Sequence, residues 1–317
     1  MSTVATTEIK LTPRHNPRGS VRARLQDALP KIVLAPSFVV TLIFVYGFII
    51  WTGYLSFTNS KTFPSYVLTG PRAYQRLWRW TFESDPPSSW YTSITNIAIF
   101  GVLYIGICLV LGLLLAILLD QKIRGEGVLR PIYLYPMALS FIVTGVAWKW
   151  FLDPGLGLEQ TLHQWGWTSF HFDWIKNKDF VIYTVVIAGV WQASGFIMAM
   201  FLAGLRGIDG EIMKAAQIDG ATTFQLYHRI VIPLLRPVFL SAFIVLAHLA
   251  IKSYDLVVAL TSGGPGGSAW LPSNFMYEYT FKRNEMAVGS ASAIIMLMAI
   301  VAIIVPYLYS ELREKPR

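Results

Sequence analysis

Long apolar stretches without charged residues alternate with shorter polar segments along this chain of 317 residues. Five stretches contain no Asp, Glu, Lys or Arg, and they cover residues 32–59, 90–119, 131–148, 180–205 and 288–310. A sixth stretch, 231–260, is interrupted by Arg236, Lys252 and Asp255. Because about 18 or more apolar residues suffice to cross a bilayer as a helix, each stretch is a candidate membrane span.

This pattern predicts an all-α membrane protein with six transmembrane helices in one polytopic domain, 32–310. We expect the spans at about 32–57, 93–119, 131–148, 180–205, 231–258 and 288–310. A basic tail, 1–31, precedes the spans, a polar loop, 206–230, joins the fourth span to the fifth, and a short tail, 311–317, follows. The first apolar stretch is too long for the apolar part of a signal peptide, so we expect it to be retained.

Composition excludes an ordinary soluble domain, since 54% of the residues are apolar and only 14% are charged. The net charge of +8 would suit a nucleic-acid partner, but its distribution follows membrane topology. With the N-terminus inside, 16 of the 26 Lys and Arg residues fall in inner segments, whereas the 18 acidic residues divide equally. The positive-inside rule therefore predicts that both termini are cytoplasmic, and we expect no nucleic-acid partner. Cys108 is the only cysteine, which excludes a disulfide within the chain.

The polar segment between the fourth and fifth apolar stretches carries helix signals of its own. Asp209 is a favourable N-cap for a first helix, and Gly220 permits a positive φ at a sharp bend. Thr222 and Gln225 have the spacing of a capping box, which predicts a second helix that runs to about Ile232. Two short helices at an angle would form a rigid knob, and an ordinary amphipathic loop is the alternative.

The same segment resembles the EAA loop of ABC import permeases, whose pattern is Glu-Ala-Ala, three residues, Gly, nine residues and Ile-x-Leu-Pro. The residues at matching places are Ala215, Ala216, Gly220, Ile230 and Pro233. Lys214 stands where the family has glutamate and Ile232 where it has leucine, so an ion pair of that glutamate with the ATPase is not carried over. The residues for which the resemblance implies ATPase coupling are Glu211, Lys214, Ala215, Ala216, Asp219, Gly220, Ala221, Ile230 and Pro233.

The resemblance extends over nearly all of residues 30–312 and points to the sugar-transporting, maltose-type branch of these permeases. The segments that carry it are NIAIFGVLYIGICLVLGLLLAILLD (96–120), RPIYLYP (130–136), WKWFLDPGLGL (148–158), WQASGF (191–196) and LTSGGPG (260–266). More closely, the stretches WQASGFIMAMFLAGLRG and AHLAIKSYDLV are similar to bacterial glucose/mannose import permeases. The large outer insertion of the maltose permease is missing here, so its contacts with the binding protein are not carried over.

This resemblance implies the type I ABC importer permease fold and a transport subunit rather than an enzyme. The implied partners are a second, similar permease in a heterodimer, two ATPase subunits and an extracytoplasmic sugar-binding protein. ATP and Mg²⁺ would bind to the partner ATPase, and this chain would bind no cofactor. It would lie in the lipid bilayer of the bacterial inner (plasma) membrane and import glucose or mannose, with another sugar or a glycerol-phosphate-type solute as alternatives.

Polar side chains within the apolar stretches are candidates for a sugar pathway. Charges near a bilayer core cost about 2.5–3.5 kcal/mol each, so they should face protein or water. His248, Lys252 and Asp255 are spaced by four and three, which places them on one face of the fifth predicted helix. They would line the pathway or its outer gate, or else Lys252 and Asp255 would pair at the outer interface.

Aromatic faces and amide or hydroxyl groups suit sugar binding, and several such side chains lie in or beside the predicted spans. The candidates are Asn96, Trp148, Trp191, Gln192, Ser194 and Tyr254. Interfacial anchoring by the tryptophans and hydrogen bonding between helices are the alternative for this set.

The sequence contains no convincing catalytic motif. Residues 264–269 formally fit a Gly-x-Gly-x-x-Ala dinucleotide pattern, but they contain a proline and follow a membrane stretch rather than a strand. No P-loop is present, so the energy has to come from a partner, and His163 and His171 lack metal spacing. The competing hypotheses are an ion-driven carrier and a membrane enzyme acting on lipid-linked sugars or acyl groups. The only carboxylate group for such an enzyme is Asp209, Glu211 and Asp219.

Overall fold

The computed structural model describes residues 31, 33–83, 89–121 and 125–313. The chain divides into two compact units, 1–51 and 52–317. The described part of the first unit is helical and includes the π-helix η1 (Leu42–Tyr46) and the start of α2 (Gly47–Leu55). Every described residue up to Trp51 is exposed, and the run Val33–Leu55 is long and apolar enough to cross a membrane. The predicted tail 1–31 lies almost wholly outside the described residues, as does part of the tail 311–317.

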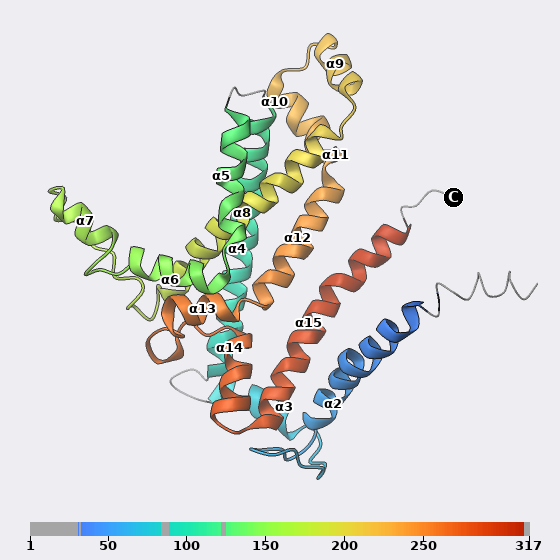
Figure 1. The fold of residues 1–317 in the computed structure, drawn as a ribbon, viewed down its shortest axis with the longest axis vertical. Coiled ribbons are helices and arrows are strands. Elements are labelled where there is room, and N and C mark those ends of the chain that lie inside the picture. Colours follow the sequence, from blue (N-terminus) through green and yellow to red (C-terminus); the bar gives the residue numbers. More distant parts are fainter. Residues whose placement is uncertain (1–30, 32, 84–88, 122–124, 314–317) are drawn as a thin grey trace, which may run out of the picture. The chain divides into compact units, whose positions relative to one another are not determined.

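Two long helices, α4 (Ser89–Asp120) and α8 (Val181–Arg206), form the centre of the second unit (Figure 1). Buried positions recur every fourth residue on α4, which gives it one continuous packing face, at Asn96, Phe100, Tyr104, Cys108, Gly112 and Ala116. A Cβ at Gly112 would come within 2.6 Å of the Ile197 side chain, so this glycine sets the close approach of the two helices. The most apolar stretch of α8 is 67% buried against 28% for α4, which makes α8 the innermost helix.

The predicted span 131–148 is two helices rather than one. Helix α5 (Glu126–Ala138) and helix α6 (Phe141–Phe151) meet at an angle of 101°, two residues after Pro136. The Ser140 hydroxyl accepts the Val143 N–H and so begins α6 anew. On the neighbouring helix α8, the Gln192 side-chain amide donates to the Leu139 carbonyl at 2.8 Å, which satisfies a backbone group that the break leaves free.

The predicted span 231–258 is also interrupted. Short helices α10 (Thr223–Leu226), η2 (Tyr227–Val231) and α11 (Ile232–Leu234) lead into α12 (Arg236–Ile251), with a bend of 64° at Leu235. Pro237 lacks the N–H that would bond back across this bend, and its ring disfavours a straight helix. The second loop helix therefore runs through Pro233 to Leu234, slightly farther than predicted.

A further break separates α12 from α13 (Tyr254–Thr261), which packs against α6. A Cβ at Gly145 of α6 would lie 2.6 Å from the Ala259 Cβ of α13, so the two helices touch nearly backbone to backbone at this point. Short elements complete this end of the unit: α3 (Arg72–Glu83), α7 (Leu158–Gln164), η3 (Pro265–Gly267), α14 (Pro272–Tyr277) and η4 (Glu278–Lys282). The last long helix is α15 (Met286–Arg313).

Within the described residues the fold is all-helical, and the only β contact is an isolated bridge between Thr58 and Leu68. Four described helices are long and apolar enough to cross a membrane, and the number rises to six if each bent pair is one span. Figure 1 shows α9 (Gly210–Ile218) and α14 at opposite ends of the second unit.

Candidate functional site

The loop between α8 and α12, residues 207–235, contains the elements α9 to α11 and is here called the α9–α11 loop. Its first helix begins where the Asp209 carboxylate accepts the Glu211 N–H at 2.9 Å, as predicted. It ends in a Schellman motif around Gly220, which has φ +80. Gly220 donates to the Gln217 carbonyl at 3.1 Å, and Ala221 donates to the Ala216 carbonyl at 3.0 Å. Gly220 is therefore needed for its backbone conformation, because a Cβ there would meet no atom within 4 Å.

The second helix of the loop begins with the predicted capping box. The Gln225 N–H donates to the Thr222 hydroxyl at 3.3 Å, and the Thr222 N–H donates to the Gln225 side-chain oxygen at 2.9 Å. Only Ala221 separates this cap from Gly220, so one helix ends and the next begins within three residues. The angle between them is thus defined by hydrogen bonds within the loop itself.

The loop is fixed to the rest of the second unit by apolar packing and by ion pairs. Ala216, Leu226, Val231 and Leu235 are buried in the main core cluster, and Ile208, Met213, Ala221, Tyr227 and Ile230 pack partly buried against it. At its base, Arg206 pairs with Asp120 at 3.7 Å and with Glu126 at 2.5 Å, which joins the ends of α8, α4 and α5. These contacts indicate that the loop is held rigidly and is not a flexible linker.

The exposed face of the α9–α11 loop carries two large apolar side chains that the sequence analysis missed. Ile218 is 86% exposed and Phe224 is 77% exposed, with its ring stacked on His228 at 5.8 Å. Ile218 lies two residues after the buried Ala216, and Phe224 lies two residues before the buried Leu226, so both are on the opposite face of their helix. This spacing is the only signal in the sequence that they are exposed. Ile212 and Leu234 of the loop are also exposed, at 43% and 48%, and exposed apolar groups gathered on one surface element are typical of a docking surface.

Residues of the predicted coupling set divide between these two faces. The alanine pair is split, because Ala215 is exposed whereas Ala216 is buried against this chain's own core. The residue at the family's glutamate position, Lys214, forms an exposed ion pair with Glu211 at 3.0 Å. With Asp209 as a helix cap and Glu211 paired to lysine, two of the three carboxylates of a hypothetical enzyme have structural partners instead.

Among the predicted sugar-pathway residues, Trp148 and Trp191 lie together, with ring centroids 5.9 Å apart and ring planes at 72°. Trp191 is 38% exposed. Gln192 beside it is buried, and its side-chain oxygen has no hydrogen-bond partner among the described residues. Ser194, two residues farther along α8, is half-buried. An unpaired buried acceptor is rare in a folded protein, and this one belongs to the residue that follows Trp191.

Asn96 lies elsewhere. Its side-chain amide donates to the carbonyls of Ser268 at 2.7 Å and Trp270 at 3.0 Å, so it fixes the glycine-rich segment that follows α13. It also lines a polar cavity of about 470 Å³ together with Lys178 and Asp179.

The prediction that His248, Lys252 and Asp255 share one helix face is wrong. Helix α12 ends at Ile251, and the N–H of Tyr254 donates to the Lys252 carbonyl at 2.8 Å, so the chain turns between the second and third of these residues. All three side chains are exposed, and no ion pair joins them in the described part of the chain. Tyr254 packs instead against Tyr277, with centroids 5.0 Å apart.

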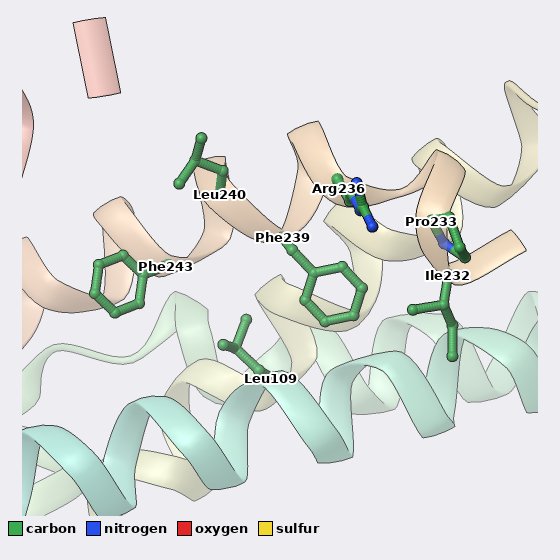
Figure 2. A pocket seen from close by; sticks show the side chains of 7 residues that line it. All are labelled: Leu109, Ile232, Pro233, Arg236, Phe239, Leu240 and Phe243. Atoms are coloured by element: carbon green, nitrogen blue, oxygen red, sulfur yellow. The ribbon is translucent and has the colours of Figure 1, made fainter. Parts of the chain in front are cut away.

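An apolar groove of about 600 Å³ runs between α4 and the segment α11–α12 (Figure 2). Its lining residues are Leu109, Ile232, Pro233, Arg236, Phe239, Leu240 and Phe243. Figure 2 shows Leu109 and Phe239 facing one another across it, with Pro233 at one end. The proline of the predicted coupling pattern therefore lies at the junction of the loop and this groove.

The fold and this loop define a membrane transport subunit, and the comparisons with known proteins agree. Residues 108–314 match the family of binding-protein-dependent transport system inner membrane components, and the chain belongs to this family. A probable ABC transporter permease protein of Pyrococcus horikoshii is 40% identical over 93% of this chain and all of its own length. The xylose/arabinose import permease protein of Haloferax volcanii is 34% identical, over 87% of this chain and 86% of its own length.

A solved structure shares the fold. The crystal structure of a bacterial ABC transporter that imports the acidic polysaccharide alginate has a chain with a TM-score of 0.78 and 18% identity, covering 93% of this chain and 99% of that chain. The resemblance to ABC import permeases is confirmed by the family match and by these relatives. The protein is a multi-pass permease subunit of a binding-protein-dependent ABC transporter and not an enzyme.

Proposed function

We propose that the α9–α11 loop docks on a partner ATPase and transmits its movement to the membrane helices, so that ATP hydrolysis drives sugar import. The single observation that carries this proposal is the Schellman motif at Gly220 next to the capping box at Thr222. Together they hold two helices at a fixed angle, and a lever of this kind can switch between two docked positions without deforming.

The docking surface we propose is the exposed face of the loop. Ile218 and Phe224 supply apolar contact, Ala215 permits close approach, and the pair of Glu211 with Lys214 presents charge at the rim. Ala216, Gly220 and Ala221 act behind that face, since they build the helix end that presents it. The glycine, the buried Ala216 and the partly buried Ala221 thereby have a structural reason to occupy these positions.

The assembly that this role requires is a second permease, two ATPase subunits that bind ATP and Mg²⁺, and an extracytoplasmic sugar-binding protein. The family description, which names dependence on a binding protein, supports this composition. We propose that each bent helix pair forms one span, which gives six spans, and that both termini and the α9–α11 loop are cytoplasmic. The basic inner segments support this orientation in a bacterial-type inner membrane.

For the solute we propose a monosaccharide that contacts Trp148, Trp191 and Gln192. The exposed indole and the buried unpaired amide oxygen support this placement. The sequence resemblance favours glucose or mannose, whereas the relative from Haloferax volcanii is a xylose/arabinose import permease. Comparing glucose and mannose with xylose and arabinose therefore decides the choice of solute.

The test is to reconstitute the complete transporter in liposomes with its binding protein and to measure ATP hydrolysis and uptake against glucose, mannose, xylose, arabinose and maltose. The decisive variant is Gly220→Val, in which a β-branched residue must adopt φ +80. Gly210→Val is the matched control, because a Cβ at Gly210 also meets no atom within 4 Å and its φ is not positive.

We expect Gly220→Val to lower sugar-stimulated uptake at least about tenfold, since about 1–3 kcal/mol of backbone strain melts the turn, while Gly210→Val transports normally. Equal transport by both variants would refute the coupling role. Uptake by this chain without an ATPase would refute the importer assembly. Stimulation by a sugar other than glucose or mannose would overturn only the choice of solute.

A further inference from the structure

Three side chains with metal-binding groups meet in the segment between α6 and α8. Glu159 and His163 lie one turn apart on α7, so they share a face of that helix. His171 reaches the same place because the chain turns back at Gly166, which has φ +96. One nitrogen of each imidazole and one carboxylate oxygen lie within 4.8 Å of one another. Sequence spacing missed this cluster because the spacing of two histidines does not show the turn or the third ligand.

Neighbouring backbone groups orient these side chains. The Nε2 atom of His163 lies 2.7 Å from the Phe170 carbonyl oxygen, and because a carbonyl only accepts, this nitrogen carries the proton and Nδ1 keeps its lone pair. The Phe172 N–H donates to Glu159 Oε2 at 3.0 Å, which leaves Oε1 facing His171 Nδ1 at 3.1 Å. Such hydrogen bonds behind the ligands are typical of metal sites, where they fix the imidazole tautomer and the carboxylate.

The exposure of the cluster also suits a cation that enters from outside. The Glu159 side chain is 13% exposed and accepts the Phe172 N–H, whereas the His171 side chain is 75% exposed. The carboxylate is therefore held in place, and His171 lies on the exposed side of the cluster.

We propose that Glu159, His163 and His171 bind one divalent transition-metal ion of the Zn²⁺ class. Two imidazoles and one carboxylate are ligands that this class prefers, and three protein ligands leave a fourth position for water. The ion would close a loop from α7 to His171 and so fix two exposed indoles at its tip, those of Trp165 and Trp167. This inference does not depend on the proposed coupling role or solute.

The test uses the complete transporter, purified with a histidine-free tag, stripped with a chelator and titrated with ZnCl₂ against a competing dye. The diagnostic variants are His163→Gln, His171→Gln and Glu159→Gln, the last of which keeps an acceptor for the Phe172 N–H. His228→Gln and His248→Gln are matched controls, because both histidines are exposed and lie on other elements. Co²⁺ replaces Zn²⁺ in a second titration, since its visible absorption reports the coordination.

We expect the parent transporter to bind one equivalent per copy of this chain, with affinity at least about tenfold lower in each diagnostic variant and unchanged in the controls. Affinity should also fall as the pH is lowered through the histidine range, because protons compete for the imidazoles. Equal binding by parent and His163→Gln, or equal loss in the controls, would overturn the proposal. Sugar-stimulated ATP hydrolysis is measured in parallel, so that loss of metal binding is distinguished from loss of assembly.

Discussion

Two pairs of short helices in this protein are held together by different means. In the α9–α11 loop, the angle between α9 and α10 comes from hydrogen bonds around Gly220 and Thr222, and the outer face is exposed. Between α6 and α13, contact comes from side-by-side packing at Gly145, where only a glycine leaves room. The first pair can move as a unit because its geometry is local, whereas the second is fixed by what lies against it. The proposed lever needs the first kind of rigidity, and a layer of packed helices needs the second.

The largest expected effect comes from the packed pair. Gly145→Ala places a Cβ 2.6 Å from the Ala259 Cβ and 3.0 Å from the Leu260 backbone nitrogen, so the two helices must separate. We expect a loss of stability of about 1–3 kcal/mol, as for other overpacked cores. The measurement is the thermal unfolding of the detergent-solubilised transporter.

Gly106→Ala on α4 is the control for this substitution, since a Cβ there meets no atom within 4 Å. It should be neutral or stabilising by up to about 1 kcal/mol, because alanine is the better helix former. If the Gly145→Ala and Gly106→Ala variants unfold at the same temperature, the contact at Gly145 does not fix α6 and α13. The contrast between this pair and the α9–α11 loop would then be wrong.

A smaller effect is expected in the loop. Thr222→Val removes the hydroxyl that accepts the Gln225 N–H, which should cost about 1 kcal/mol of local stability. We expect amide exchange at the start of α10 to accelerate about fivefold while the unfolding temperature of the whole transporter stays nearly constant. Mass-resolved hydrogen exchange of peptides covering 221–228 measures this.

The neighbouring Thr223→Val is the matched control, because Thr223 is exposed and lies inside the helix rather than at its cap. Equal exchange in the two variants would show that the capping box does not determine the loop. A large drop in global unfolding temperature for Thr222→Val would show that the capping box stabilises the whole transporter and not only the loop.

The difference between an angle fixed by local hydrogen bonds and a contact fixed by packing also explains which parts of the fold could be predicted from the sequence. The start of α9, its end before Gly220 and the start of α10 follow from residues within a few positions of one another, so Asp209, Gly220 and the capping box sufficed to predict them. The break between α12 and α13 was not predicted, because a distant helix, α6, packs against the second half. The grouping of Glu159 with His171 likewise depends on a turn whose direction spacing does not give.

A serine beside the α12–α13 break looks at first like its local cause. The Ser253 hydroxyl donates to the Leu249 carbonyl at 2.7 Å and so competes with the helix bonds of α12. The Ser241 hydroxyl, however, makes the same bond to the Pro237 carbonyl at 3.0 Å within an unbroken part of α12. The hydroxyl bond by itself therefore does not end a helix, and packing on α6 remains as the cause.

The smallest effect is accordingly expected for Ser253→Ala, at most about 0.5 kcal/mol, with Ser241→Ala as its equivalent in unbroken helix. Spin labels at two exposed positions, Phe243 and Val258, report the break by their separation, since a continuous helix would place the backbones about 22 Å apart. Cys108 is buried and should stay unlabelled. The distance should remain the same in parent and Ser253→Ala. A shift toward the straight-helix separation in Ser253→Ala would show that Ser253 itself causes the break. The start of α13 would then be determined by nearby residues, as are the helices of the α9–α11 loop.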